Sequence, residues 1–300
     1  MKLNSNSYQP LVSIVVVTYN SSRFILETLE SAKKQTYKNI ELVITDDCSP
    51  DNTVEICKDW LKNNDHNFIR AKILANNTNV GVSGNCNKGL REARGDWVKF
   101  IAGDDLLMEN AIEDVVKFIN NNPESKVVFG NILKIMNGQI QPRHRKKINF
   151  CKESRQKEMA YKGYLPFAPS LFLETDFIKK IDGFNENYPF MEDYPLFLKI
   201  VNRGVPFHFL EKPVVLYRIH DQNISSNIRF IKDYENFVFK EILPFLKKNR
   251  YWMSYLHFYN LIYVRRLNMK LKDGNPLASK LLRHLVLRNL LENISRKLKL

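Results

Sequence analysis

The chain has 300 residues, of which 44% are hydrophobic, 26% charged and 12% aromatic. This is an ordinary globular composition, and it excludes disordered, collagen-like and disulfide-scaffold proteins. The net charge of +14 is uneven, because residues 229–300 hold 16 Lys or Arg against 5 Asp or Glu. A nearly balanced body with a basic appendage differs from a uniformly basic nucleic-acid-binding protein.

Strand and helix patterns alternate four times in about the first 120 residues. The strands are predicted as apolar, mostly β-branched runs, typical of strands covered on both faces, at 11–18, 40–45, 71–75 and 97–102. The helices are predicted from apolar residues at helical spacing, at 23–35, at 53–61, from the loop 79–84 through 94, and at 111–120. This alternation predicts an α/β fold, a doubly wound, mostly parallel sheet with helices on both faces.

The rest of the chain is less regular. Strands are predicted at 127–130, 170–173 and 214–219, and a helix at 194–202. From 228 onward the sequence becomes helical, aromatic and basic. We therefore expect one domain over 1–228, with halves at about 10–125 and 126–228, and a helical C-terminal region over 229–300.

The cysteines and the N-terminal residues bear on the compartment. The four cysteines show no C-x-x-C spacing and the first ten residues are polar, so we expect reduced thiols in the cytoplasm and no secretory leader. No window of 18 apolar residues lacks charges, so no membrane span is predicted.

Polar residues follow three of the predicted strands. They are Thr18-Tyr19-Asn20, Asp46-Asp47 and Asp104-Asp105. The carboxyl ends of parallel strands meet at one edge of a sheet, where α/β proteins bind ligands. Adjacent carboxylates repel each other unless a cation or hydrogen-bond donors compensate, and oxygen ligands suit Mg²⁺ or Mn²⁺. Asp104-Asp105 therefore indicates a metal site, although a turn followed by a helix cap explains the same residues.

Two further groups lie in the second half. Glu192-Asp193 precedes a predicted helix, which fits either a helix cap or a general base that deprotonates an acceptor hydroxyl. Arg218 and His220 lie two residues apart on one face of a strand, which suits a diphosphate or a metal. The sequence contains no dinucleotide-binding glycine motif, no P-loop and no nucleophile elbow, and no Cys/His cluster for zinc.

Six ordered blocks resemble the family 2 glycosyltransferases. The blocks are SIVVVTYN (13–20), ITDDCSPDNT (44–53), NVGVSGNCNKGLREARG (79–95), IAGDD (101–105), DGFNE (182–186) with Glu192-Asp193, and YRIH (217–220). The resemblance covers about residues 10–225. It implies the GT-A fold, a nucleoside-diphosphate-sugar donor and inverting transfer.

The resemblance also implies roles for individual residues. Donor binding would involve Thr18, Tyr19, Asn20, Asp47, Asn85, Lys88, Asp104 and Arg218. Asp105 and His220 would hold Mn²⁺ or Mg²⁺ on the diphosphate. Asp193 would act as the catalytic base, with Glu192 orienting either the acceptor or Asp193.

The expected reaction is metal-dependent transfer of a sugar, with UDP as the expected nucleotide, to a hydroxyl of a saccharide acceptor. One base and a metal-held leaving group imply a single in-line displacement with inversion. The expected acceptor is linked to a polyprenyl diphosphate and belongs to O-antigen or capsule synthesis. The competing hypotheses are a sugar-nucleotide nucleotidyltransferase and a basic nucleic-acid-binding protein; a processive synthase lacks support because no membrane span is predicted.

The C-terminal region carries its own prediction. Residues 229–300 include aromatics at helical spacing, among them Trp252, Tyr255 and Tyr259, and leucines interleaved with Lys and Arg between 280 and 298. This pattern suits a helix in the headgroup region of an anionic leaflet. Packing on the catalytic domain or on a second subunit in a homodimer explains it equally well. We expect a peripheral protein on the cytoplasmic face of the bacterial inner membrane, with no nucleic-acid partner.

Overall fold

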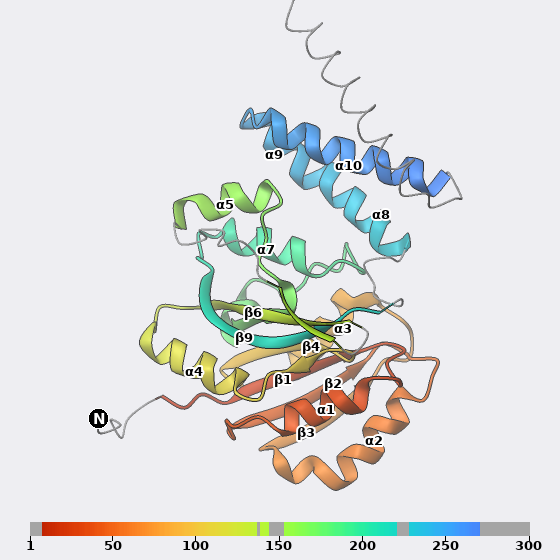
Figure 1. Cartoon of the computed structure of the whole chain (residues 1–300), viewed down its shortest axis with the longest axis vertical. Helices are drawn as coiled ribbons and strands as arrows, with labels where there is room; N and C mark the ends of the chain where they lie inside the picture. Colours follow the sequence, from red (N-terminus) through yellow and green to blue (C-terminus); the bar gives the residue numbers. More distant parts are fainter. Residues whose placement is uncertain (1–7, 137–138, 144–152, 221–227, 271–300) are drawn as a thin grey trace, which may run out of the picture. The chain divides into compact units, whose positions relative to one another are not determined.

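The buried apolar runs form four parallel strands in the computed structural model, which describes residues 8–136, 139–143, 153–220 and 228–270. The strands β1 (Val12–Thr18), β2 (Ile40–Asp46), β3 (Arg70–Ala75) and β4 (Trp97–Ala102) lie in the order β3-β2-β1-β4 (Figure 1). Val12 pairs with both Ile40 and Trp97, and Thr18 pairs with Asp46. The carboxyl ends therefore lie at one edge, as predicted.

The sheet continues with strands of mixed direction. β8 (Leu171–Glu174) is antiparallel to β4, and β6 (Val127–Met136) is antiparallel to β8. β9 (His208–Arg218) runs parallel to β6 and antiparallel to β5 (Leu106–Leu107), while β7 (Gln139–Arg143) is antiparallel to β6. Through β9, the residues after Arg218 are brought next to the segment that follows β4.

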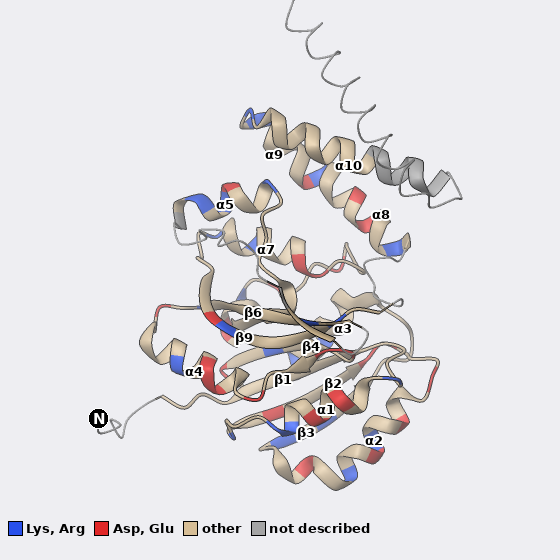
Figure 2. Ribbon diagram, viewed as in Figure 1, with Lys and Arg blue, Asp and Glu red and all other residues tan. Residues whose placement is uncertain are grey.

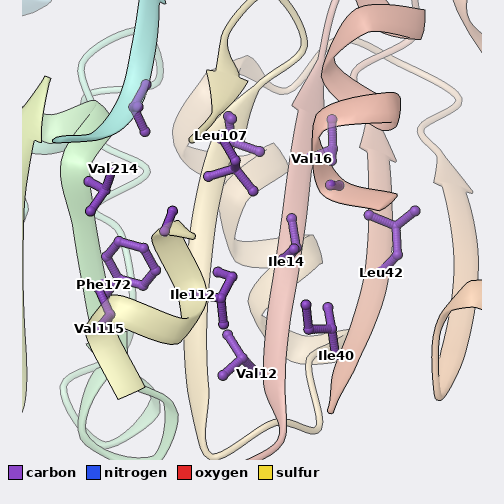
Figure 3. Close-up of a cluster of buried hydrophobic side chains, with 14 of the residues drawn as sticks. Val12, Ile14, Val16, Ile40, Leu42, Leu107, Ile112, Val115, Phe172 and Val214 are labelled. Atoms are coloured by element: carbon purple, nitrogen blue, oxygen red, sulfur yellow. The ribbon is translucent and has the colours of Figure 1, made fainter. Parts of the chain in front are cut away.

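Helices cover both faces of the sheet, as the alternation predicts. One face packs against α1 (Ile25–Lys33), α2 (Thr53–Asn64) and α4 (Ala111–Asn121). Figure 3 shows this core, which includes Ile14 of β1 and Leu42 of β2 together with Ile112 and Val115 of α4. A 3-10 turn, η1 (Asp65–Asn67), links α2 to β3.

The opposite face carries α3 (Gly81–Glu92), which packs on β1 and β2. A Cβ on Gly89 would come within 2.4 Å of a Val15 methyl carbon, so glycine lets the helix approach β1 closely. Most of the side chains of α3 are buried although several are polar, among them Ser83, Asn85 and Asn87. Buried polar groups are hydrogen-bonded in folded proteins, and the polar side chains of α3 connect it to the sheet and to the loop before α7 (Asp193–Val201).

The second half of the first unit supplies shorter elements. They are α5 (Glu153–Tyr161), the 3-10 turn η2 (Ala168–Ser170), α6 (Thr175–Lys180) and α7 (Asp193–Val201). The predicted strand at 214–219 is the end of the longer β9, whose first residues alternate between half-buried and exposed. The predicted helix at 194–202 corresponds to α7.

The chain divides into two compact units, Met1–Phe230 and Ile231–Leu300. The second is helical, with α8 (Ile228–Phe237) leading through the π-helical turn η4 (Val238–Ile242) into α9 (Leu243–Lys248) and α10 (Trp252–Lys270). No helix in the described part of the chain is both long and apolar enough to cross a membrane. The predicted basic and leucine-rich stripe between 280 and 298 lies outside the described residues.

Candidate active site

The carboxyl ends of β1 and β2 form the first part of the site. Tyr19 is exposed, and Asn20 adopts a left-handed backbone (φ 54°) while its N–H donates to Ser49 Oγ at 2.8 Å. Thr18 is buried, and its hydroxyl donates to Asp46 Oδ1 at 2.7 Å. Tyr19 and Asn20 can therefore meet a ligand directly, whereas Thr18 supports them from beneath.

Asp47 is buried and fixes the start of α3. Its Oδ1 accepts hydrogen bonds from the Val80 N–H (2.9 Å) and the Asn76 side-chain amide (3.0 Å), and its Oδ2 accepts from the Gly81 N–H (2.9 Å). These amides lie at the N-terminus of a helix, where a carboxylate is favoured. The structure thus shows Asp47 as the anchor that holds α3 at the carboxyl edge of the sheet.

Asn85 and Lys88 project from α3 towards the same strands. The Asn85 amide donates to the carbonyls of Thr18 (3.3 Å) and Thr45 (3.1 Å). Lys88 Nζ donates to the Ala75 carbonyl at 2.9 Å and to Asn76 Oδ1 at 2.7 Å. Together with Thr18 and Asp47, these residues form one connected network behind the exposed edge.

The end of β4 and the end of β9 form the second part of the site. Asp104 and His220 are both half-buried, and Asp104 Oδ2 lies 2.8 Å from His220 Nε2. Asp105 is only 2% exposed, and its Oδ1 accepts the Arg218 N–H at 2.9 Å. Four predicted site residues from distant positions in the sequence therefore meet at this corner of the sheet.

Phe24 and Glu27 at the start of α1 complete this corner. The Arg218 guanidinium donates through Nε to the Asp104 carbonyl (2.9 Å) and through a terminal nitrogen to Glu27 (2.7 Å). It lies 4.6 Å from the Phe24 ring centroid, and the Phe24 and His220 rings are 5.0 Å apart. Neither residue is singled out by the sequence, because an aromatic and an acidic residue at a helix start are ordinary.

The two adjacent carboxylates, Asp104 and Asp105, differ in burial. Burial raises the pKa of Asp105 well above its usual range, and the nearby charge of Asp104 adds to that shift. Beneath them on β4, Lys99 is fully buried, and burial lowers its pKa to about 7. Asp104 is thus the more exposed of the two carboxylates, whereas Asp105 belongs to the interior.

Glu192 and Asp193 form the third part of the site, at the start of α7. Both are half-buried, and Asp193 Oδ1 accepts the Tyr194 N–H at 2.6 Å. Burial and the charge of Asp193 raise the pKa of Glu192 to about 8, while burial raises that of Asp193. The two adjacent carboxylates interact, so their two protons are released in steps that belong to the pair.

The loop before this pair is fastened to α3. The Asn87 amide donates to the Phe184 carbonyl (2.9 Å) and to Glu186 (2.7 Å), while the Phe184 N–H donates to Asn87 Oδ1 (2.8 Å). The Ser83 hydroxyl donates to the Tyr188 carbonyl at 2.8 Å. Sequence reasoning did not identify Asn87, and only its position in a polar helix could have pointed to it. The loop that leads to the carboxylate pair is therefore held by the same helix that Asp47 anchors.

The donor set at Asp104 and His220 fits a divalent cation. A carboxylate oxygen and an imidazole nitrogen face each other, and both types of atom are ligands of Mn²⁺. Among the described residues there is no group of three or more His, Cys, Asp or Glu side chains that could hold a metal. A cation here would need further ligands from the substrate.

Comparison with known proteins identifies the family. The family described as "Glycosyl transferase family 2" matches residues 13–179. A relative from Escherichia coli, "UDP-Glc:alpha-D-GlcNAc-diphosphoundecaprenol beta-1,3-glucosyltransferase WfaP", is 31% identical over 219 residues, which are 72% of this chain and 80% of WfaP.

Two solved structures share the fold. TarS (residues 1–349) from S. aureus, in complex with UDP-GlcNAc, has a TM-score of 0.61 and 25% identity, covering 74% of this chain and 64% of that one. The mannosyltransferase PcManGT from Pyrobaculum calidifontis, in complex with GDP-Man and Mn²⁺, has a TM-score of 0.60 and 19% identity, covering 95% and 81%. Both neighbours support the GT-A architecture.

Proposed function

The chain belongs to glycosyl transferase family 2, and from that premise we propose that it is an inverting, metal-dependent transferase that moves a sugar from UDP to a saccharide hydroxyl. The corner at which Asp104, His220 and Arg218 meet carries this proposal. A carboxylate and an imidazole that could hold a cation, next to a guanidinium, would stabilise the charge that develops on the leaving diphosphate. WfaP and the TarS complex, both named for UDP-sugars, support the choice of nucleotide.

The donor would bind along the carboxyl edge of the sheet. Tyr19 and Asn20 are the exposed residues that would contact the nucleoside, with Thr18, Asn85 and Lys88 holding that edge in shape. Asp47 would reach the base or ribose by giving up one of its hydrogen bonds to the start of α3.

Asp104 and His220 would hold Mn²⁺ or Mg²⁺, which, when bound, neutralises charge on the leaving diphosphate. The geometry favours Asp104 over Asp105 as the carboxylate ligand. Asp105 is buried and already accepts the Arg218 N–H, whereas Asp104 is half-buried beside His220. In this arrangement Asp105 positions Arg218 rather than contacting the donor.

Asp193 would act as the base. Burial and the Asp193 charge raise the pKa of Glu192 to about 8, so a protonated Glu192 would stand beside the Asp193 carboxylate at neutral pH. The Asp193 carboxylate accepts the proton of the acceptor hydroxyl as its oxygen bonds to the anomeric carbon, and the bond from that carbon to the diphosphate oxygen breaks. One displacement of this kind inverts the anomeric configuration.

We further propose a polyprenyl-diphosphate-linked acceptor in O-antigen or capsule synthesis, and action at the cytoplasmic face of the inner membrane. WfaP, whose name specifies a diphosphoundecaprenol-linked acceptor, supports this choice.

The test is a thermal-shift screen of sugar nucleotides with and without Mn²⁺, because a ligand stabilises the state it binds by mass action. We expect a UDP-sugar to raise the Tm only when Mn²⁺ is present, and Asp104→Asn to remove that increase. If no sugar nucleotide raises the Tm with Mn²⁺ or Mg²⁺, the proposed donor site is wrong.

A further inference from the structure

The turn between α9 and α10 in the second unit combines positive charge with exposed apolar side chains. We define it as the hairpin tip, residues 247–253, with the sequence KKNRYWM. Lys247, Lys248 and Arg250 are exposed, and Trp252 and Met253 are 52% and 76% exposed. Figure 2 shows the basic residues gathered at the end of α9.

Two backbone hydrogen bonds close the end of α9 at the tip. The Tyr251 N–H donates to the Leu246 carbonyl (2.9 Å), and the Arg250 N–H donates to the Lys247 carbonyl (3.2 Å). This is the Schellman pattern of a helix C-terminus, in which the residue in the left-handed conformation is usually glycine. Here it is Arg250, with φ 59°. An arginine occupies this position at a steric cost that glycine would avoid.

The exposed aromatics continue from the tip along α10. Trp252, Tyr255 and Tyr259 recur at i, i+3 and i+7, and their rings lie 6.1 and 6.4 Å apart in succession. Tyr259 is exposed and Tyr255 half-buried, whereas Phe258 and Ile262, which border this row on the helix surface, are buried. An aromatic row on the outer face is therefore distinct from the residues that form the core of this unit.

The stretch of sequence that contains the tip carries charges of one sign only. No Asp or Glu occurs in the sequence between Glu241 and Asp273, while seven Lys or Arg do. Lysines and arginines close to a membrane are attracted to anionic headgroups, and Trp and Tyr prefer the boundary between headgroups and acyl chains. An exposed Trp and Met beside three cations therefore suit binding to an anionic membrane surface better than binding to a water-soluble anionic polymer.

We propose that the hairpin tip inserts Trp252 and Met253 into the interface of an anionic lipid bilayer, with Lys247, Lys248 and Arg250 on the headgroups. This inference rests on the proposed lipid-linked acceptor for its choice of a membrane. It holds the protein at the surface on which that acceptor is anchored, and it requires neither a membrane span nor residues 271–300.

The experiment is co-sedimentation of the full chain with vesicles of phosphatidylglycerol and phosphatidylcholine, or of phosphatidylcholine alone. We expect binding only to the anionic vesicles at low salt. Neutralising the three cations (Lys247→Gln, Lys248→Gln, Arg250→Gln) should weaken binding on the order of 100-fold, given about fivefold for each charge. The matched control neutralises three exposed lysines of the first unit, Lys58, Lys62 and Lys117, and should bind as wild type does.

Fluorescence places the contact. The chain has three tryptophans, of which Trp60 and Trp97 are buried, so quenching by brominated anionic lipid reports on Trp252. We expect quenching in the wild type and its loss in Trp252→Phe. Binding without this quenching, or equal binding by the tip and control variants, would overturn the proposal, as would absence of vesicle binding. A preference for single-stranded DNA over anionic vesicles would identify a nucleic-acid surface instead.

The UDP-sugar thermal shift, measured on the same variants, separates the two proposals. The tip variants should retain it, because their residues are not part of the donor site. If a tip variant loses vesicle binding but keeps the UDP-sugar thermal shift, the membrane-binding role of the tip is supported independently of the donor site. If the wild type shows no UDP-sugar thermal shift, the proposed donor site is wrong, whatever the vesicle result.

Discussion

Replacing Lys99 by Met is expected to remove a pH dependence from the stability of this protein. Lys99 lies in the middle of β4 with a side chain that is 0% exposed. Its Nζ donates to the Pro169 carbonyl and, at 3.4 Å, to the Leu171 carbonyl, and it lies 4.9 Å from the Phe172 ring centroid. These contacts tie η2 and β8 to the strand that leads to Asp104 and Asp105.

The magnitude follows from the pKa. Burial lowers the pKa of Lys99 to about 7, compared with about 10.4 for an unperturbed lysine. Between these two values the unfolded chain holds a proton that the folded chain has released, so stability rises with pH across this window. At about 1.4 kcal/mol per pH unit, the free energy of unfolding should gain roughly 3 to 4 kcal/mol between pH 7 and pH 10 from this group alone.

The assay is urea denaturation of wild type and Lys99→Met at several pH values from 7 to 10. The difference between the two proteins cancels the other titrating groups, and the hydrogen bonds lost at Pro169 and Leu171 shift it by a constant amount. Lys62→Met is the matched control, because the Lys62 side chain is 72% exposed beside Asp59. If the wild-type minus Lys99→Met difference is the same at pH 7 and pH 10, the reasoning is refuted.

Other predictions concern the site. Asp104→Asn should abolish Mn²⁺ binding measured by calorimetry in the presence of UDP, whereas Asp105→Asn should retain it; the reverse result would make Asp105 the ligand. Asp193→Asn should lower kcat at least ~10²-fold with donor binding unchanged, as for loss of a general base, and a near-normal kcat would place the base elsewhere. Glu192→Gln should remove an inflection near pH 8 from the kcat profile, because burial and the Asp193 charge raise the pKa of Glu192 to about 8; an unchanged profile would contradict this. Asn87→Ala should destabilise the protein by about 1–3 kcal/mol in chemical denaturation by leaving the Phe184 N–H and C=O unpaired, and an unchanged unfolding midpoint would count against that role.

The parallel half of the sheet could be predicted because most residues of β1, β2 and β4 are buried on both faces of the sheet. The run at 11–18 has no polar alternation to confuse its assignment, and β1 occupies Val12–Thr18. The second half could not be predicted equally well. β5 has two residues, and the first part of β9 contains Glu211 and Lys212, which are exposed. Such strands are defined by their pairing partners rather than by their own sequence.

The candidate site could also be predicted only in part. Sequence places Asp46, Asp47, Asp104 and Asp105 at strand ends, but it does not say which way each side chain faces. The distinction between Asp104 and Asp105 depends on a hydrogen bond from Arg218, 113 residues further along the chain. Likewise, the partners of Asp47 are amides 33 and 34 residues away. Only the folded register brings these groups together.

The contacts of α3 connect the donor edge of the proposed site with the loop before Glu192 and Asp193, on the proposed acceptor side. Asp47 binds the amides of Val80 and Gly81 at its first turn, and a Cβ on Gly81 would lie only 2.5 Å from the Pro189 carbonyl oxygen. The Ser83 N–H donates to that same carbonyl at 3.1 Å. If Asp47 exchanges an amide for the nucleotide, the freed turn is the one that holds the loop leading to Asp193. Occupation of the donor edge would therefore act on the loop that leads to Asp193 through the first turn of α3, without contact between Asp47 and Asp193.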